Sequence, residues 1–329
     1  DGRSVRSLGL VLLAADDEEG DQAADQCQGA DSDDDPHPHG DGAVSALHGM
    51  GLDVGKGDLV AFDLAAVDMD GTLLHDDKTL DSAAPSALAE AVGAGRTVAL
   101  CTGRCVSEIR PYLPQLPMVR YAIAEVGALL YDLREKRVVA RHALPREVID
   151  AVVSFVCSED VMVQGVSAGQ AYATASMVPR MAAYNMAPYI PLYEQTATLV
   201  PRMTDLLEDP TRTWEKLNLF HRSTQARERT RERLGGLPAV ESYSEVTSLE
   251  VTPLGIDKGS IRALCELLGI DASRALAIGD SDNDLAAFRD AGMGVAVANA
   301  SERALGAADA LVSAHDKGGV AEAVRRYLM

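Results

Sequence analysis

The chain has 329 residues, 47 % of them hydrophobic and 24 % charged, and its formal net charge at pH 7 is −20. This length and apolar content suit about two globular domains with sizeable cores. The negative charge would repel a phosphate backbone, which argues against a nucleic-acid partner. Because no apolar run reaches about eighteen residues, the sequence offers no candidate membrane-spanning helix, and we expect no membrane partner.

Residues 1–58 are expected to form a disordered acidic N-terminal extension. Residues 1–62 carry fourteen acidic side chains against three basic ones, and residues 16–41 hold almost no large apolar side chain. Such a segment cannot bury enough surface to offset the entropy lost on ordering. The apolar run 8–15 follows two arginines but leads into an acidic block rather than a small-residue cleavage site, so we favour a cytoplasmic protein over an exported one. Met50 is an alternative start of the chain.

The five cysteines agree with a cytoplasmic protein, since they are scattered and no pair has C-x-x-C spacing. This usage predicts reduced thiols. Cys101 and Cys105 flank a polar loop and could form a redox-sensitive pair. We favour the simpler interpretation of one buried strand cysteine and one helix cysteine.

The first strongly patterned segment is the apolar run 64–67, followed by the sequence D-M-D-G-T at residues 68–72. A buried strand that ends in two carboxylates and a turn is predicted here. At a strand end both carboxylates can address one small site, one as a nucleophile and one as an acid or base. Gly71 permits the tight turn and leaves backbone N–H groups free to meet an anion. Asp63 lacks the second Asp and the Gly-Thr, so we reject it as the nucleophile.

The following segments alternate between helix and strand patterns. The predicted helices cover 82–93, 105–113, 258–268, 284–291, 301–307 and 320–327, and the predicted strands cover 97–100, 119–131, 275–278, 294–297 and 310–312. This alternation predicts the α/β class with a parallel sheet. Polar loops follow the strands that end at residues 67, 101 and 278. In a doubly wound sheet these loops gather at the carboxyl edge, where ligands bind.

The spacing of the polar loops predicts an inserted domain. Only 32 residues separate Asp70 from Thr102, which is enough for one strand–helix–strand unit, whereas 156 separate Thr102 from Lys258. We therefore expect an α+β cap domain at 142–249. The α/β core would be formed by 59–141 and 250–329.

Four segments in this order resemble the haloacid dehalogenase-like hydrolase superfamily, and in particular its Cof-like phosphatase branch. They are D-M-D-G-T at 68–72, T-G-R at 102–104, K-G at 258–259 and G-D-S-D-N-D at 279–284. The resemblance covers roughly residue 60 to the C-terminus. It implies a doubly wound, Rossmann-like core with an inserted cap that closes over the site and sets substrate choice. It also implies a Mg²⁺-dependent phosphatase of small phosphorylated metabolites, such as sugar phosphates, that works through an aspartyl-phosphate intermediate.

The resemblance assigns a role to each catalytic residue. Asp68 would be the nucleophile, Asp70 the acid/base, and Thr102 and Lys258 would bind the transferring phosphate. A cation at a helix start is mildly unfavourable, so Lys258 in that place suggests an anion nearby.

The resemblance also implies ligand contacts. The Mg²⁺ ligands would be Asp68, the backbone carbonyl of Asp70 and Asp280, with Asp284 as an additional or supporting acid. Asn283 would donate to phosphate and help to hold Lys258, whereas Asp282 is expected to be a solvated acid. The phosphate and substrate contacts would come from Met69, Gly71, Gly103 and Asn283.

A few positions are left open or depart from the family pattern. Arg104 could reach the substrate or face solvent. Cof-like proteins usually carry Asn-Gly-Ala after the third core strand, whereas this chain has Val126 in place of the Asn. This difference puts substrate specificity in doubt but not phosphoryl transfer. Trp214 is expected in the core of the cap, and His221 is expected to be structural or exposed.

Three other functions remain as alternatives. A phosphomutase of the same superfamily would use the same residues. A catalytically weak sensor would bind a phosphorylated metabolite, although it would have no physical reason to keep Asp70. A structural protein would depend on the acidic extension. The expected partner is a small phosphorylated metabolite, and the chain would be a monomer or a homodimer.

Overall fold

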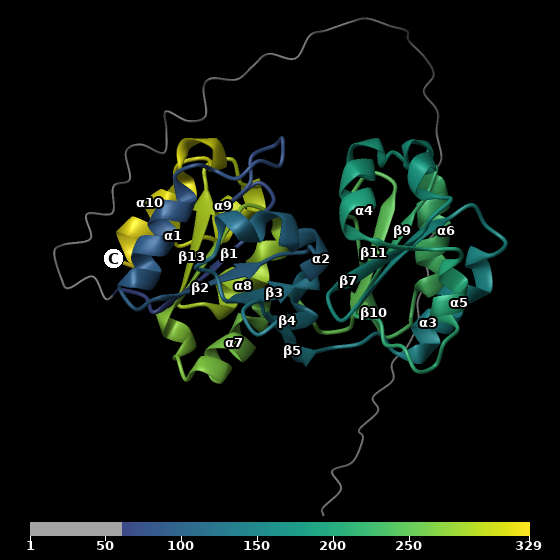
Figure 1. The fold of residues 1–329 in the computed structure, drawn as a ribbon, viewed down its shortest axis with the longest axis horizontal. Coiled ribbons are helices and arrows are strands. Elements are labelled where there is room, and N and C mark those ends of the chain that lie inside the picture. Colours follow the sequence, from purple (N-terminus) through teal and green to yellow (C-terminus); the bar gives the residue numbers. More distant parts are fainter. Residues whose placement is uncertain (1–60) are drawn as a thin grey trace, which may run out of the picture. The chain divides into compact units, whose positions relative to one another are not determined.

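The computed structural model describes residues 61–329 (Figure 1). The prediction of a disordered extension over residues 1–58 lies outside the described residues. Two β-sheets, one of eight strands and one of six, organise the described part of the chain. Within residues 61–329, no helix has the length and apolar character needed to cross a bilayer.

The eight-stranded sheet has the order β14-β13-β12-β1-β2-β3-β4-β5. Neighbouring strands from β14 to β3 run parallel, and β4 and β5 add antiparallel strands at one edge. The strands are β1 Leu64–Val67, β2 Thr97–Cys101, β3 Tyr121–Ala124, β4 Leu129–Asp132, β5 Arg137–Arg141, β12 Ala275–Gly279, β13 Met293–Val297 and β14 Ala310–Val312.

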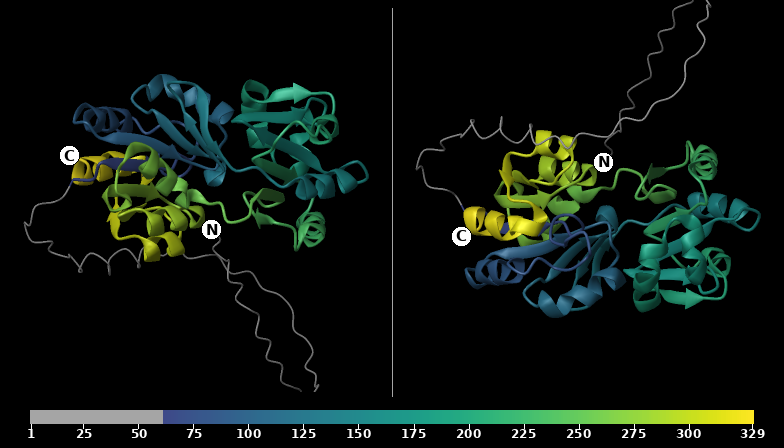
Figure 2. Two further views of the ribbon diagram at one scale, coloured as in Figure 1. Left: turned by 90° about the horizontal axis from the view of Figure 1, so that it is seen from below. Right: turned by 90° about the horizontal axis from the view of Figure 1, so that it is seen from above.

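Helices cover both faces of this sheet, so the predicted doubly wound α/β core is confirmed. On one face the apolar core includes residues of α1 (Ala84–Gly93), α2 (Val106–Ile109) and α10 (Gly319–Tyr327). Figure 2 shows α10 beside α1. On the other face the core includes residues of α7 (Ile261–Leu268), α8 (Leu285–Asp290) and α9 (Glu302–Ala307).

The sequence explains these elements locally. Strand β1 reads Leu-Ala-Ala-Val and all four residues are buried, as expected for a parallel strand covered on both faces. Helix α1 buries Ala84, Ala87, Leu88 and Ala91, which lie along one helical face, and a proline stands in its first turn. Helix α7 ends at Gly269 in the left-handed conformation that favours glycine.

Two predicted helices are shorter than expected because their first or last turns are 3₁₀. The segment predicted as a helix over 105–113 forms α2 and then a 3₁₀ turn over Arg110–Gln115, which contains two prolines that cannot donate a helical hydrogen bond. The segment predicted from Lys258 begins with a 3₁₀ turn at Lys258–Ser260 before α7.

The six-stranded sheet has the order β10-β11-β9-β6-β7-β8, and only the β7–β8 pair is parallel. Its strands are β6 Met162–Ser167, β7 Gln170–Thr174, β8 Thr198–Val200, β9 Lys216–Phe220, β10 Ala239–Ser242 and β11 Ser248–Pro253. The helices of this region are α3 Arg146–Val156, α4 Ile190–Thr196, α5 Met203–Leu207 and α6 Thr224–Leu234.

One face of the six-stranded sheet packs on α3, α5 and α6 to form an apolar core. Trp214 lies in this core with 1 % of its surface exposed, as predicted. His221 is buried, and its two ring nitrogens bond to Thr230 and to the carbonyl of Thr247. Its role is therefore structural, one of the two possibilities that were expected.

The six strands all lie between β5 and α7 in the chain, so this sheet is an insertion in the core, and we call it the cap sheet. The predicted boundary at Leu249 is four residues too early, because β11 continues to Pro253 and pairs with β9 and β10. The physical reason is the alternation of β11, in which Val251 packs into the apolar core of the cap.

Candidate active site

A buried lysine joins the two acidic loops at the carboxyl edge of the core sheet. Lys258 Nζ donates to Asp68 Oδ1 at 2.6 Å and to Asp284 Oδ1 at 2.7 Å. Lys258 is fully buried, and Asp68 and Asp284 are 4 % and 2 % exposed. Burial opposes the charge on the lysine, but the two carboxylates outweigh it and raise the pKa of Lys258 above its ordinary value. The ammonium therefore stays charged between two carboxylates.

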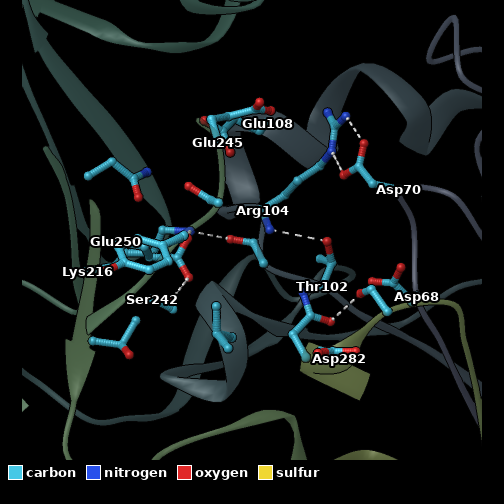
Figure 3. A pocket seen from close by; sticks show the side chains of 18 of the residues that line it. Asp68, Asp70, Thr102, Arg104, Glu108, Lys216, Ser242, Glu245, Glu250 and Asp282 are labelled. Atoms are coloured by element: carbon cyan, nitrogen blue, oxygen red, sulfur yellow. Dashed lines mark hydrogen bonds and ion pairs between the residues drawn. The ribbon is translucent and has the colours of Figure 1, made fainter. Parts of the chain in front are cut away.

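Asp70 lies two residues beyond Asp68 and forms a separate ion pair. Arg104 donates two hydrogen bonds to the Asp70 carboxylate, from Nε at 2.6 Å and from Nη2 at 2.7 Å (Figure 3). Lys78 Nζ lies 3.0 Å from Asp70 Oδ1. Burial raises the pKa of Asp70, but Arg104 and Lys78 outweigh it and lower that pKa from 3.8 to about 2. In this arrangement Asp70 is a carboxylate.

The side chain of Arg104 therefore neither faces solvent nor lies free in the cavity. It is 9 % exposed and its guanidinium carbon lies 5.4 Å from the centre of the Tyr112 ring. Of the two alternatives for Arg104, a solvent-facing side chain is therefore wrong, whereas contact with the substrate stays a prediction, since Arg104 also lines the cavity of the site. Sequence could not indicate the ion pair with Asp70, because the two residues are 34 positions apart.

Thr102 and Gly103 form the loop after β2. The Thr102 amide donates to the carbonyl of Ile123 on the neighbouring strand at 2.8 Å, which extends the sheet pairing into the loop. Thr102 Oγ1 accepts from the Arg104 amide at 3.1 Å. The Gly103 carbonyl accepts from Lys216 Nζ of the cap at 2.8 Å. The loop is thus held from both the core and the cap.

The loop after β12 is organised by Asp284. Its Oδ2 accepts from the amides of Asp280 and Ser281 at 3.1 and 3.0 Å, while its Oδ1 accepts from Lys258. Asp280 Oδ1 accepts from the Thr72 hydroxyl at 3.1 Å. Gly71 has a φ of +74°, and a Cβ there would lie 2.4 Å from Asp280 Oδ2. The glycine is therefore needed both for the turn and for the approach of Asp280.

The acidic side chains fit a divalent cation. One carboxylate oxygen each from Asp68, Asp280 and Asp284 lies within 4.8 Å of the others. Such a set of oxygens is what Mg²⁺ prefers. Both oxygens of Asp284 already accept hydrogen bonds, so Asp68 and Asp280 are the side chains better placed to hold an ion, and Asp284 supports them.

A cavity of about 840 Å³ opens onto these residues. Its core side is lined by Asp68, Asp70, Thr102, Gly103, Asp280 and Asn283. Lys258 and Asp284 do not line the cavity; Lys258 bonds to Asp68, which does, and Asp284 bonds to Lys258. Asp282 lies at the rim, where it pairs with Arg303 at 2.6 Å, in keeping with the solvated acid that was expected.

Two expected contacts are arranged differently. The Met69 side chain is fully buried in the core, and its carbonyl accepts the amides of Thr72, Leu73 and Leu74, so only its backbone N–H could meet a ligand. Lys258 is held by acidic side chains rather than by Asn283, whose Oδ1 accepts from the Ser281 hydroxyl at 3.1 Å. A charged acceptor binds an ammonium more strongly than an amide does, which is the physical reason.

The cap side of the cavity contains residues that the sequence reasoning missed. They are Gln164, Lys216, Asn218, Ser242, Glu250 and Thr252, from β6, β9, β10 and β11. The available signal was the alternation of β9, in which Lys216 and Asn218 point to one face of the sheet and Leu217 and Leu219 to the other. That alternation identifies two faces but not what the polar face contacts.

The chain is similar to known proteins over most of its length. A family model described as haloacid dehalogenase-like hydrolase matches residues 65–324. The chain is 28 % identical over 274 residues to "Putative phosphatase YxeH" of Bacillus subtilis (strain 168), covering 82 % of this chain and 99 % of that protein. It is 27 % identical over 268 residues to 5-amino-6-(5-phospho-D-ribitylamino)uracil phosphatase YcsE of the same strain, covering 81 % of this chain and 96 % of that protein.

A solved structure shows the same fold. The crystal structure of a haloacid dehalogenase-like hydrolase from Bacteroides thetaiotaomicron superposes with a TM-score of 0.70 at 26 % identity, covering 80 % of this chain and 99 % of that chain. The family model spans most of the described residues. The chain therefore belongs to the haloacid dehalogenase-like hydrolase family and is an enzyme of the hydrolase class.

Proposed function

We propose that this protein is a Mg²⁺-dependent phosphatase that hydrolyses small phosphorylated metabolites through an aspartyl-phosphate intermediate. The observation that carries the proposal is the pair of carboxylates at the end of β1. Asp68 is held by a buried ammonium and Asp70 by an arginine, and both line one cavity. The name of the relative YcsE, a phosphatase of a ribityl phosphate, supports a small phosphorylated substrate.

In the first step an Asp68 oxygen attacks phosphorus, so that a carboxylate–phosphorus bond forms and the ester phosphorus–oxygen bond breaks. Protonated Asp70 gives its proton to the leaving oxygen, which departs as an alcohol. In the second step Asp70 takes a proton from water as the water attacks phosphorus. Inorganic phosphate leaves and Asp68 returns as a carboxylate.

The surrounding residues of the chain bind and orient the phosphoryl group. The Thr102 hydroxyl and the Gly103 N–H lie at the cavity and can donate to phosphate oxygens. Lys258 is positioned by two carboxylates and supplies positive charge to the transferring group. A bound Mg²⁺, held by Asp68, Asp280 and the Asp70 carbonyl, would neutralise the negative charge of the phosphate and carboxylates that meet here.

The ion pair of Asp70 bears on the first step. Asp70 must carry a proton to act as the acid, whereas Arg104 and Lys78 stabilise its carboxylate. The proposal therefore requires the Asp70 carboxyl group to separate from the Arg104 guanidinium when the substrate is bound.

The test is phosphate release from a panel of phosphate monoesters, with and without Mg²⁺. Metal-dependent release that is lost in Asp68→Asn is the expected result. Asp63→Asn is the matched control, since Asp63 lies at the other end of β1 in ion pairs with Arg96 and Arg274. A folded wild-type protein that releases no phosphate from any ester would contradict the proposal, and isomerised product from a hexose phosphate would indicate a mutase.

A further inference from the structure

A buried lysine of the cap sheet contacts the loop after β2. Lys216, on β9, forms an ion pair with Glu250 of β11, and its Nζ donates to the carbonyl of Gly103 at 2.8 Å (Figure 3). Both charged side chains are buried. Burial opposes the charge on the lysine, but Glu250 outweighs it and raises the pKa of Lys216 above its ordinary value. The cap therefore holds a charged ammonium against a backbone carbonyl of the core.

The carbonyl that Lys216 binds belongs to the same peptide group as the amide of Arg104. In a trans peptide the C=O and the N–H point in opposite directions. On the other side of the group, the Arg104 amide donates to Thr102 Oγ1 at 3.1 Å. One peptide group is thus bonded at both ends, to the ammonium of the cap and to the hydroxyl oxygen of Thr102. By binding the carbonyl, Lys216 also fixes the direction of the amide.

This arrangement bears on what the Thr102 hydroxyl can do. A hydroxyl has one proton to donate and lone pairs that accept. Because the Arg104 amide occupies a lone pair of Thr102 Oγ1, the O–H itself is left to donate to another group. Thr102 lines the cavity, where the phosphate of the proposed substrate would be the acceptor. A cation on the carbonyl also polarises the peptide and strengthens the hydrogen bond from its N–H.

Three other cations line the cavity, and each has its partners elsewhere. Lys78 and Arg104 pair with Asp70 through their side chains. Arg289 pairs with two acidic residues, Asp257 and Asp290. Of the cations that line the cavity, Lys216 alone binds the Gly103 carbonyl. It is therefore the side chain through which the cap can act on the orientation of Thr102.

We propose that Lys216 is a positioning residue for phosphoryl transfer, which acts through the peptide between Gly103 and Arg104 to direct the Thr102 hydroxyl toward the phosphate. This inference rests on the proposed phosphatase function and deepens it. Because the phosphate rather than the leaving group is affected, loss of Lys216 should slow the turnover of every ester alike. A lysine that bound the leaving group would instead change KM, and would do so for some esters only.

The test begins with Lys216→Ala on p-nitrophenyl phosphate, on glucose 6-phosphate and on the ester that the wild-type protein hydrolyses fastest. We expect kcat to fall about 10–100-fold for each ester that the wild-type protein uses, because a misdirected donor acts mainly in the transition state, where charge spreads over the transferring oxygens. KM should stay within about threefold of the wild-type value.

Chemical rescue then shows whether the ammonium acts as a hydrogen-bond donor. Propylammonium has the carbon chain and the ammonium group that the substitution removes, and Lys216 lines the cavity through which the amine can enter. We expect it to raise kcat of Lys216→Ala about fivefold or more. Tetramethylammonium carries the charge without an N–H and should not restore turnover. Lys317→Ala, at an exposed lysine outside the cavity, is the matched control and should respond to neither cation.

A double variant separates this effect from a loss of folding. Lys216→Ala leaves Glu250 buried without its cation, which can destabilise the protein. Lys216→Ala combined with Glu250→Gln removes both charges. It should show the same fall in kcat and the same response to propylammonium.

The outcomes separate this inference from the one on which it rests. Wild-type kcat in a folded Lys216 variant would overturn the inference and leave the phosphatase intact. Equal rescue by tetramethylammonium would do the same, because charge without a donor would then be sufficient. A change in KM for one ester alone would place Lys216 against the leaving group and contradict the role through the peptide. Absence of phosphate release from every ester by the wild-type protein would overturn both.

Discussion

At the scale of single residues, the site depends on charges that are buried together. Lys258 has no contact with solvent and is held between Asp68 and Asp284. Removing one partner of such a group leaves the others uncompensated, which costs about 3–5 kcal/mol. The same ammonium would stabilise charge on the transferring phosphoryl group, so one residue serves both stability and the proposed chemistry.

Lys258→Met should therefore lower phosphate release by about 10²–10³-fold and lower the free energy of unfolding by about 3–5 kcal/mol. Phosphate assays and urea unfolding would measure the two effects. Lys317→Met, at an exposed lysine paired with Asp316, should change neither. Wild-type turnover by folded Lys258→Met would contradict the role proposed for the ammonium.

The cysteines of the described chain differ in exposure rather than in pairing. Cys101, Cys105 and Cys265 are buried and Cys157 is exposed. Burial raises the pKa of the Cys101 thiol to about 12 and raises that of Cys105 as well, so both stay protonated. This agrees with the structural interpretation of Cys101 and Cys105 rather than with a redox-sensitive pair.

Among these four thiols, an alkylating reagent should modify Cys157 first in the native protein. Mass spectrometry of peptides after brief labelling at pH 8 would show the order. All four should react after denaturation in urea. Rapid labelling of native Cys105 would contradict the burial argument.

Val126 replaces the usual family Asn at a strained position. Its φ of +58° and ψ of +31° lie in the left-handed region, which is rare for a β-branched residue and suits Asn or Gly. The Val126 side chain lines the cavity, and its Cγ2 would lie 3.7 Å from a Cβ added at Gly103. Valine at this position therefore has a conformational cost, next to the loop formed by Thr102 and Gly103.

Val126→Asn should stabilise the protein by about 1 kcal/mol, because Asn tolerates this conformation. The midpoint of urea unfolding would measure the gain. Val126→Ile keeps the β-branch and should give no gain. If both variants lower the midpoint equally, packing rather than backbone strain governs this position.

At the scale of elements, Asp63 links the amino ends of three parallel strands through hydrogen bonds. Asp63 precedes β1 and accepts hydrogen bonds from Arg96, which precedes β2, and from Arg274, which precedes β12. Strand β1 pairs with both β2 and β12. This network is structural and lies at the opposite end of β1 from the proposed nucleophile.

Stability should depend on pH through this network. The hydrogen bond from Arg274, with the charges of Arg274 and Arg96, lowers the pKa of Asp63 below 3.8. A lowered pKa in the folded state contributes stability above the unfolded value, and that contribution is lost as pH falls below about 3.8.

We accordingly expect Asp63→Asn to be less stable than wild type by about 1 kcal/mol or less at pH 7, with the difference shrinking as the pH falls below about 3.8. Urea unfolding of both proteins across this pH range would check the trend. A difference that grows on acidification would have the wrong sign for this mechanism.

At the scale of the whole molecule, the two sheets supply different sides of the same cavity. The core sheet places the loops after β1, β2 and β12 at one edge, as a parallel sheet does. The cap sheet is inserted between β5 and α7 and presents its polar face to the same cavity. Under the proposed function, the core would carry the chemistry and the cap would contact the rest of the substrate, and the two meet at contacts such as Lys216 to Gly103.

The part of the chain that the structure describes, residues 61–329, contains every candidate site residue. A chain that begins at Asp58 should therefore release phosphate with kcat/KM within about twofold of the full chain. Asp68→Asn in the shortened chain is the control for contaminating phosphatase. A large loss of kcat/KM on shortening would support the alternative in which the acidic extension is essential.

Much of the fold and of the site could be predicted because the signals are local. The strand–turn signature at 68–72, the polar loops after β2 and β12 and the long interval before Lys258 each depend on neighbouring residues or on simple spacing. These signals led to the doubly wound core, to the inserted cap sheet and to the residues that line the core side of the cavity.

The sequence by itself thus determined the class of fold, the acidic loops and the family. Only the tertiary structure decided which partners those side chains have. Arg104 bonds to Asp70, Lys258 bonds to Asp68 and Asp284, and Glu108 of α2 accepts a hydrogen bond from Gln164 of the cap sheet. The reason is that the partners in these pairs lie 26 to 190 residues apart in the chain. Their contact depends on strand order, register and packing between distant segments, which no local pattern specifies.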